Sequence, residues 1–71
     1  MNHYQPGDRV EVNIIPACFE STPPIWVPAV VTSATDPKYG WTAARTLRNS
    51  QHPGISRSPG WNQDEIRRRE S

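Results

Sequence analysis

The run Trp-Val-Pro-Ala-Val-Val-Thr at positions 26–32 does most to limit what this chain can fold into. It is the most apolar stretch of the sequence, and its valines and tryptophan favour a strand at the centre of a small sheet. Successive side chains of a strand point to opposite faces, so Val27, Ala29 and Val31 share one side. Pro28 has no backbone N–H and is best placed where the missing donor faces solvent or a bulge. We therefore predict that Val27, Ala29 and Val31 face the core.

A second strand is predicted over residues 9–14, directly after the turn sequence Pro-Gly-Asp at positions 6–8. Val10, Val12 and Ile14 alternate with polar residues, which is the pattern of an antiparallel strand with one buried and one solvated face. We expect the two strands to share one apolar side.

A third strand is predicted over residues 41–47, and the sequence leaves its inner face open. If the odd-numbered positions point inward, the charge of Arg45 is buried. If the even-numbered positions do, the core receives only Ala44 and two threonines and is thin. We expect a twist or a bulge to resolve the conflict.

The connections between these strands are long and rich in turn residues. Residues 15–25 and 48–59 are predicted loops, and a turn precedes the third strand. In that turn Asp36 is expected to accept hydrogen bonds from the backbone, and Gly40 to take a positive φ. We expect Phe19 to fold back over an open end of the sheet, because a small core needs its aromatic residues.

Residues 62–69 have two interpretations. Asn62 followed by Glu65 forms a capping box, and an acidic start with a basic end suits a helix. Alternatively, Asp64 and Glu65 form a single helical turn, and residues 66–68 close the sheet against the first strand.

Length and composition limit the class of protein. The chain has 71 residues, enough for one domain with a small core. Eight prolines and four glycines are spread along it, which is typical of short strands joined by many turns. The single Cys18 cannot form an internal disulfide, which suits a reducing compartment. No apolar run is long enough to span a membrane and no signal peptide is evident, so the expected location is cytoplasmic.

Several stretches together resemble a known type of fold. They are Gly-Asp-Arg-Val-Glu-Val at 7–12, the apolar run at 26–31, a turn before Trp41, and Asp-Glu-Ile-Arg at 64–67. The pattern resembles the small Src-homology-3-like barrels, nearest to Tudor and Agenet domains and to small phage or bacterial barrels. The resemblance implies an all-β, five-stranded SH3-like barrel with long loops and at most one short helical turn near the C-terminus. It would form one domain over residues 1–71, with residues 1–6 as an N-terminal arm and 67–71 as a basic tail that can fray.

The same resemblance implies a candidate ligand site. Tudor and Agenet domains bind methylated lysine or arginine in an aromatic cage, through cation–π attraction. Carried onto this chain, the cage residues would be Phe19, Trp26 and Tyr39. The sequence departs from the family at Val27, where an aromatic residue is common.

The motifs of catalysis and metal binding do not occur in the sequence. Cys18, His3 and His52 lack the spacing of a nucleophile with its base or of a metal site. Asp64 and Glu65 are adjacent, so their carboxylates diverge on either a strand or a helix. We therefore expect a non-catalytic protein that uses no metal or other cofactor.

Basic residues gather in the C-terminal half of the chain. Residues 1–36 carry one arginine against four carboxylates, a net −3, and residues 37–71 carry seven basic residues against three carboxylates, a net +4. Arginine and tryptophan are common at protein interfaces and also hold phosphates and stack on bases. The candidate partner-binding residues are Trp41, Trp61, Arg45, Arg48, Arg57, Arg67, Arg68 and Arg69.

These residues predict docking on an acidic face of a protein partner, as in a small phage-type accessory or inhibitor protein. Nucleic acid is an alternative partner, although the overall net charge of +1 is low for a dedicated nucleic-acid binder. Self-association into a structural homo-oligomer is a third hypothesis. No membrane partner is expected.

Overall fold

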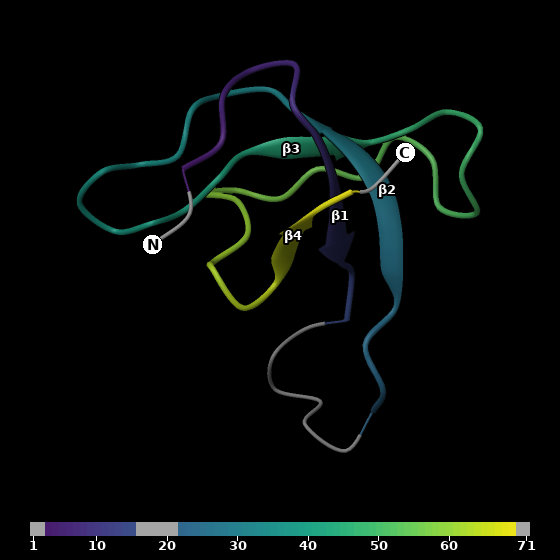
Figure 1. Cartoon of the computed structure of the whole chain (residues 1–71). Helices are drawn as coiled ribbons and strands as arrows, with labels where there is room; N and C mark the ends of the chain where they lie inside the picture. Colours follow the sequence, from purple (N-terminus) through teal and green to yellow (C-terminus); the bar gives the residue numbers. More distant parts are fainter. Residues whose placement is uncertain (1–2, 16–21, 70–71) are drawn as a thin grey trace.

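The computed structural model describes residues 3–15 and 22–69, and within these ranges the chain is all-β, without a helix. Four strands form one antiparallel sheet in the order β3-β2-β1-β4 (Figure 1). The strands are β1 (Arg9–Asn13), β2 (Trp26–Val31), β3 (Ala44–Thr46) and β4 (Ile66–Arg68). The predicted all-β class is confirmed, and the two central strands are the two that the sequence marks most clearly.

The pairing of β1 with β2 confirms the predicted inner face. Val10 lies opposite Ala29, and Val12 lies opposite Val27, and all four side chains are buried. Val31 is buried on the same side. The core cluster also includes residues that lie outside β1 and β2, namely Tyr4, Ala44, Trp61 and Ile66.

The even-numbered positions of the third segment point inward. Thr42, Ala44 and Thr46 are buried, whereas Arg45 is exposed. The buried threonine hydroxyls have partners: Thr42 Oγ1 lies 2.9 Å from Thr35 Oγ1, and Thr46 Oγ1 accepts a hydrogen bond from the Ile55 amide at 2.7 Å. Hydrogen-bonded threonines therefore complete the core that looked thin in the sequence.

The tail forms a closing strand, so the helix interpretation of residues 62–69 is wrong. Residues 62–65 make a turn in which Asn62 Oδ1 accepts from the Asp64 amide at 2.9 Å and the Glu65 amide donates to Asn62 O at 3.0 Å. β4 then pairs antiparallel with β1, with Ile66 opposite Val12. Ile66 is buried, and this apolar contact explains why the chain continues as a strand.

The predicted turns have the expected geometry. Asp36 Oδ1 accepts from the amides of Lys38 and Tyr39, at 2.7 Å and 3.0 Å. Gly40 takes a φ of 78°, and its amide donates to Asp36 O at 2.9 Å. The turn before β3 is therefore stabilised by a backbone hydrogen bond and by the carboxylate of Asp36.

Trp61 is a core residue, and its predicted exposure to a partner is wrong. Its side chain is 1% exposed, and its indole N–H donates to Asn13 O at 2.9 Å. An indole is large for the small core of a 71-residue chain. Ala29 and Ala44 belong to the same cluster, and their small side chains leave that room.

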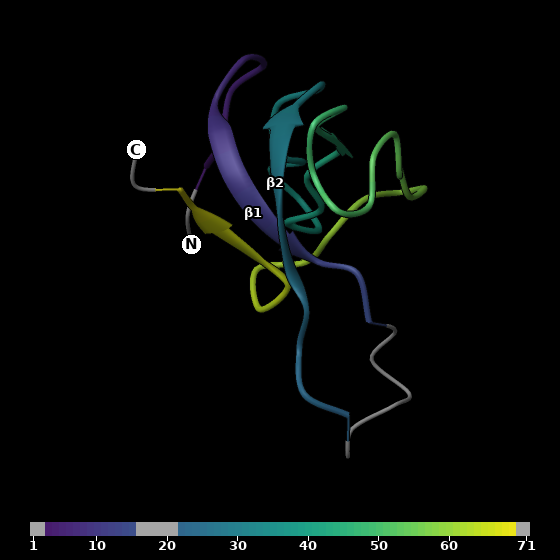
Figure 2. The same cartoon turned by 90° about the vertical axis from the view of Figure 1, so that its right-hand side faces the viewer.

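The structure shows one four-stranded antiparallel sheet, and it does not show this sheet closed into a five-stranded barrel. β3 and β4 are the two ends of the strand order, and Figure 2 shows the yellow β4 on the other side of β1 from β2. Two isolated bridges extend the pairing: Thr42 with Trp61, and Arg45 with Ser56. The first bridge joins the chain before β3 to the chain before β4. Phe19, predicted to cover one end of the sheet, lies outside the described residues.

Candidate functional site

The solvent-facing side of the sheet is the first candidate site. Its residues are those that alternate with the core positions, so the buried face fixes which side chains point outward. From β1 it presents Arg9 and Glu11, from β2 Trp26, Pro28 and Val30, from β3 Arg45, and from β4 Arg67.

Arginines from separate strands lie in one line across this face. Arg9 is directly opposite Val30, and Val30 is directly opposite Arg45. On the other side of Arg9, the Arg69 amide donates to Arg9 O at 3.1 Å, which continues the β1–β4 pairing by one step. Arg69 is two positions after the outward Arg67 and so shares its side. We call Arg69, Arg9 and Arg45 the arginine row.

The arginine row is not neutralised within the described part of the chain. No ion pair joins any of its three guanidinium groups to a carboxylate there. Neighbouring strands are about 4.8 Å apart, so the backbones of Arg9 and Arg45 lie about 10 Å apart, with Val30 between them. Arg69 and Arg9 lie opposite each other on neighbouring strands, where like charges repel, and Arg45 lies one strand further away.

Arg67 belongs to the same face, but it is already paired. Its Nε donates to Glu11 Oε1 at 2.9 Å, and its guanidinium carbon lies 4.1 Å from the centre of the Trp26 ring. Trp26 is therefore covered by a cation of its own chain. Glu11 and Arg67 cancel in charge, which leaves the arginine row as the net positive feature of this face.

Two further predicted contact residues hold the fold together. Arg57 forms an ion pair with the buried Glu65, with 3.0 Å between the charged atoms, and lies 5.2 Å from the centre of the Trp61 ring. Arg68 lies 3.7 Å from a carboxylate oxygen of Asp8 and 5.2 Å from the centre of the Tyr4 ring. Both arginines therefore shield core aromatic rings.

The remaining predicted contact residues lie on the surface outside the row. Arg48 is exposed in the loop after β3, and Trp41 is half-buried. Arg9 was not among the predicted contact residues. Its outward position follows from the alternation with Val10 and Val12, but its place between Arg69 and Arg45 depends on the register of three strands, which a single sequence does not show.

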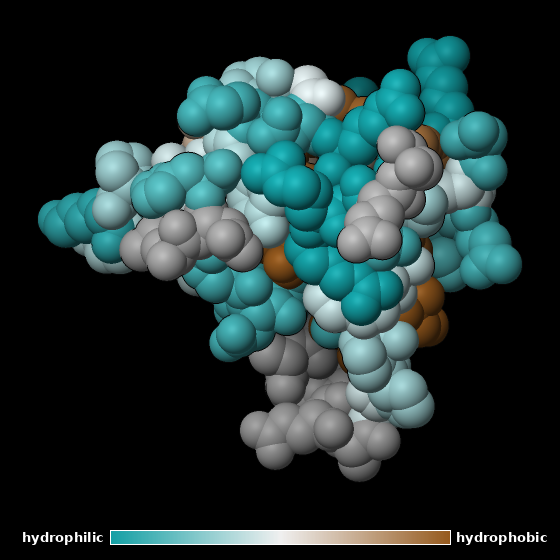
Figure 3. Space-filling model, viewed as in Figure 1, coloured by the Kyte–Doolittle hydropathy of each residue, from teal (hydrophilic) through white to brown (hydrophobic). Residues whose placement is uncertain are grey.

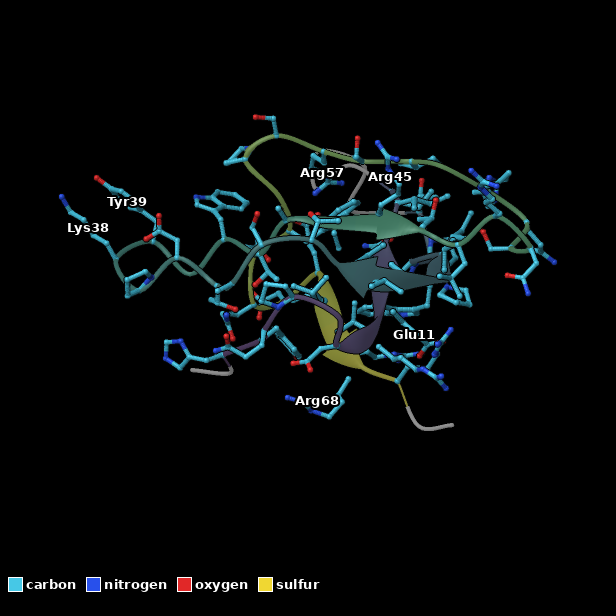
Figure 4. All side chains as sticks on the ribbon, turned by 90° about the horizontal axis from the view of Figure 1, so that it is seen from above. Glu11, Lys38, Tyr39, Arg45, Arg57 and Arg68 are labelled. Atoms are coloured by element: carbon cyan, nitrogen blue, oxygen red, sulfur yellow. The ribbon has the colours of Figure 1, made fainter. Side chains whose placement is uncertain are left out.

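A second candidate site is a pocket of about 550 Å³ at the turn before β3, which we call the aromatic groove. Figure 4 shows Lys38 and Tyr39 projecting from the end of this turn, away from the labelled arginines. Tyr39 is 66% exposed. The groove is lined by Ser33, Ala34, Asp36, Tyr39, Trp41, Ala43 and Pro59.

The predicted aromatic cage is not assembled by the described residues. Tyr39 lines the aromatic groove, whereas Trp26 lines a smaller pocket of about 350 Å³ with Pro28 and residues 49–51. Phe19, the third predicted cage residue, lies outside the described ranges. Trp26 is the first residue of β2, whereas Tyr39 lies in the turn between β2 and β3.

The face of the molecule seen in Figure 3 is largely polar. The view in Figure 3 is mostly hydrophilic, in keeping with a mean hydropathy of −0.78. Within residues 3–15 and 22–69, no three His, Cys, Asp or Glu side chains gather as metal ligands would. In the same ranges no helix has the length and apolar character that crossing a bilayer requires.

No family model, curated protein or solved structure matches this chain. The likeness to Src-homology-3-like barrels therefore depends on the residue pattern alone.

Proposed function

We propose that this chain is a non-catalytic interaction module that docks on an acidic face of a protein partner through the arginine row. The observation that carries the proposal is the line Arg69, Arg9 and Arg45 on one open sheet face, without a carboxylate partner in the described chain. An acidic partner would reduce the repulsion between these arginines. That reduction would contribute to the free energy of binding.

The surroundings of the row favour a protein over nucleic acid. Val30 lies within the row and Pro28 beside it, and apolar side chains between arginines are typical of protein interfaces. Trp26 is already stacked against Arg67 and is not free to stack on a base. These features suit a small accessory or inhibitor protein of the phage type.

Nucleic acid is the second candidate partner, because three arginines on one exposed face suit a phosphate backbone. The two candidates differ in their response to salt. Binding to nucleic acid weakens steeply with added salt as counterions are released, and a protein complex with apolar contacts is less sensitive.

We also make a proposal about the curvature of the sheet. The bridge between Thr42 and Trp61, with both backbone hydrogen bonds at 2.9 Å, ties together the two ends of the sheet. We infer that the sheet curls toward a Src-homology-3-like barrel, with the arginine row on its outer wall.

The decisive experiment measures binding with and without the row. A host lysate treated with nuclease is passed over the immobilised native chain, over the double variant Arg9→Ala/Arg45→Ala, and over Arg48→Ala as the matched control. Any captured protein is then purified and titrated against all three. We expect tenfold or greater loss of affinity for the double variant and little change for Arg48→Ala, which removes an exposed arginine outside the sheet. Equal affinity of all three proteins contradicts the proposal, and capture that disappears with nuclease favours nucleic acid.

A further inference from the structure

We propose that the partner docks by adding an extended acidic strand to the open edge of β4, with a carboxylate of that strand opposite Arg69. This inference rests on the proposed function, because it takes an acidic protein as the partner of the arginine row. It goes further by naming the kind of segment that binds and the backbone groups that receive it.

The backbone of β4 has one edge bonded to β1 and one open edge. The Arg69 amide donates to Arg9 O at 3.1 Å, so the odd-numbered residues of this segment direct their amides and carbonyls toward β1. The amides and carbonyls of Ile66 and Arg68 therefore point away from β1, and β4 is the last strand of the sheet on this side. No group in the part of the chain that the structure describes forms a hydrogen bond with them.

The opposite edge of the sheet, along β3, is already covered by this chain. The Thr46 amide donates to Ile55 O at 3.0 Å, and Thr46 O accepts from the Gly54 amide at 3.2 Å. Further along the same edge, Thr42 exchanges both backbone hydrogen bonds with Trp61. A partner strand can therefore pair with β4 without displacing a segment of this chain, which it could not do at β3.

The arginine row begins at the open edge. Its outermost member is Arg69, whose guanidinium has no ion pair within the described residues. On an antiparallel partner strand, the residue opposite Arg69 would form a non-hydrogen-bonded pair, in which Cα atoms lie about 4.5 Å apart and side chains are closest. β4 already makes a contact of this kind on its other side, where Glu11 lies opposite Arg67 with 2.9 Å between the charged atoms.

The charge of β4 determines which strand can be added. Arg67, Arg68 and Arg69 are consecutive, and the side chains of the first two are 53% and 62% exposed. Pairing with β4 of a second copy would place these arginines beside those of the other chain, and like charges on neighbouring strands repel. The same charges attract a strand that carries carboxylates. The edge therefore disfavours self-association and favours an acidic segment.

The first test measures amide hydrogen exchange of the native chain by NMR. The probe is a synthetic peptide in which glutamate alternates with threonine, added at about ten times its dissociation constant. Exchange of the Ile66 and Arg68 amides should slow about tenfold, because these amides are protected while the peptide is bound. The amide of Arg48, in the exposed loop after β3, should be unaffected.

The control peptide has glutamine in place of each glutamate and should bind about tenfold more weakly, since it lacks the charge. Equal binding of the two peptides contradicts the requirement for an acidic strand. Binding of the glutamate peptide that leaves the Ile66 and Arg68 amides unprotected overturns the inference. No binding of that peptide at millimolar concentration overturns it as well.

The second test removes one outward amide from the edge. Arg68→Pro lacks this N–H, and proline is tolerated on an edge strand where the N–H faces solvent. Arg68→Ala loses the same side chain but keeps the N–H, so it is the matched control. We expect Arg68→Pro to bind the glutamate peptide about fivefold more weakly than Arg68→Ala, through the loss of one hydrogen bond. Equal affinity of the two folded variants contradicts strand addition. If Arg68→Pro does not fold, the exchange experiment on the native chain decides.

A comparison with Arg9→Ala/Arg45→Ala separates this inference from the proposed function. If the double variant loses affinity for a captured partner and Arg68→Pro binds that partner as well as Arg68→Ala does, the row docks without strand addition and this inference alone fails. If the double variant retains full affinity for the partner while the glutamate peptide still protects the Ile66 and Arg68 amides, strand addition stands and the proposed role of the row fails.

Discussion

Ala29 lies at the point where β2 is flanked on both sides, by Val10 of β1 and by Thr46 of β3. It is completely buried. Replacing it with arginine places a guanidinium among apolar side chains that offer no carboxylate, at a cost that exceeds the stability of a domain this small.

We therefore expect Ala29→Arg to lack a cooperative thermal transition by circular dichroism. Thr32→Arg adds the same group at an exposed position just beyond β2 and should melt close to the native chain. Similar melting of the two variants would mean that Ala29 does not face the core.

Gly60 is the glycine that a side chain would disturb most. Its φ is 136°, and an added Cβ would lie 2.4 Å from Thr42 O. Gly54 also has a positive φ, of 73°, but an added Cβ there meets nothing within 4 Å. Gly54 therefore serves as a reference for a positive φ without a clash, whereas Gly60 combines a more strained φ with a clash.

Gly60→Ala should cost at least about 2 kcal/mol of unfolding free energy, and Gly54→Ala about 1 kcal/mol. Urea unfolding of both variants measures the difference. Equal losses would show that the chain near Trp61 can move away from Thr42 without penalty.

At the scale of elements, β4 closes the sheet through one buried side chain. Ile66 packs in the core opposite Val12, whereas Arg67 points to solvent. We expect Ile66→Ala to cost about 2–3 kcal/mol, since it removes buried carbon atoms from a small core.

Arg67→Ala should cost about 1 kcal/mol or less, because its contacts with Glu11 and Trp26 are largely exposed. Chemical denaturation of the two variants compares them directly. A tail that formed a separate helix would reverse or remove the difference.

The strands differ in how far their sequence determines them. β1 and β2 are predictable because apolar and polar residues alternate in both, and Val10, Val12, Val27 and Ala29 all lie where the alternation puts them. The inner face of β3 is not predictable, because it depends on side-chain hydrogen bonds of buried threonines, such as the one that Thr46 Oγ1 accepts from the Ile55 amide. The local pattern therefore predicts the inner face of a strand only where the inward side chains of that strand are apolar.

The candidate site is less predictable than the strands. The sequence predicts that the arginines of the C-terminal half bind a partner. In the structure, Arg57 and Arg68 instead lie over the rings of Trp61 and Tyr4. Arg9 joins Arg69 across 60 positions of sequence. Such a site depends on the pairing of strands that are far apart in the chain, and composition does not reveal it.

At the scale of the whole molecule, the arginine row would affect the stability of the fold and the proposed docking in opposite directions. Under the proposed function, three unpaired cations in one line repel one another in the free protein and would attract an acidic partner. A change that neutralises the row should therefore stabilise the fold and abolish docking.

Arg9→Glu places a carboxylate between Arg69 and Arg45 and should raise the unfolding free energy by roughly 0.5–1 kcal/mol at low salt. The gain should largely disappear at 1 M salt, where charges are screened beyond about 3 Å. Arg48→Glu, in the exposed loop after β3, should leave stability unchanged. Urea unfolding at low and high salt measures both effects. If Arg9→Glu is less stable than the native chain at low salt, the row is not under repulsion, and the proposed reason for acidic docking no longer holds.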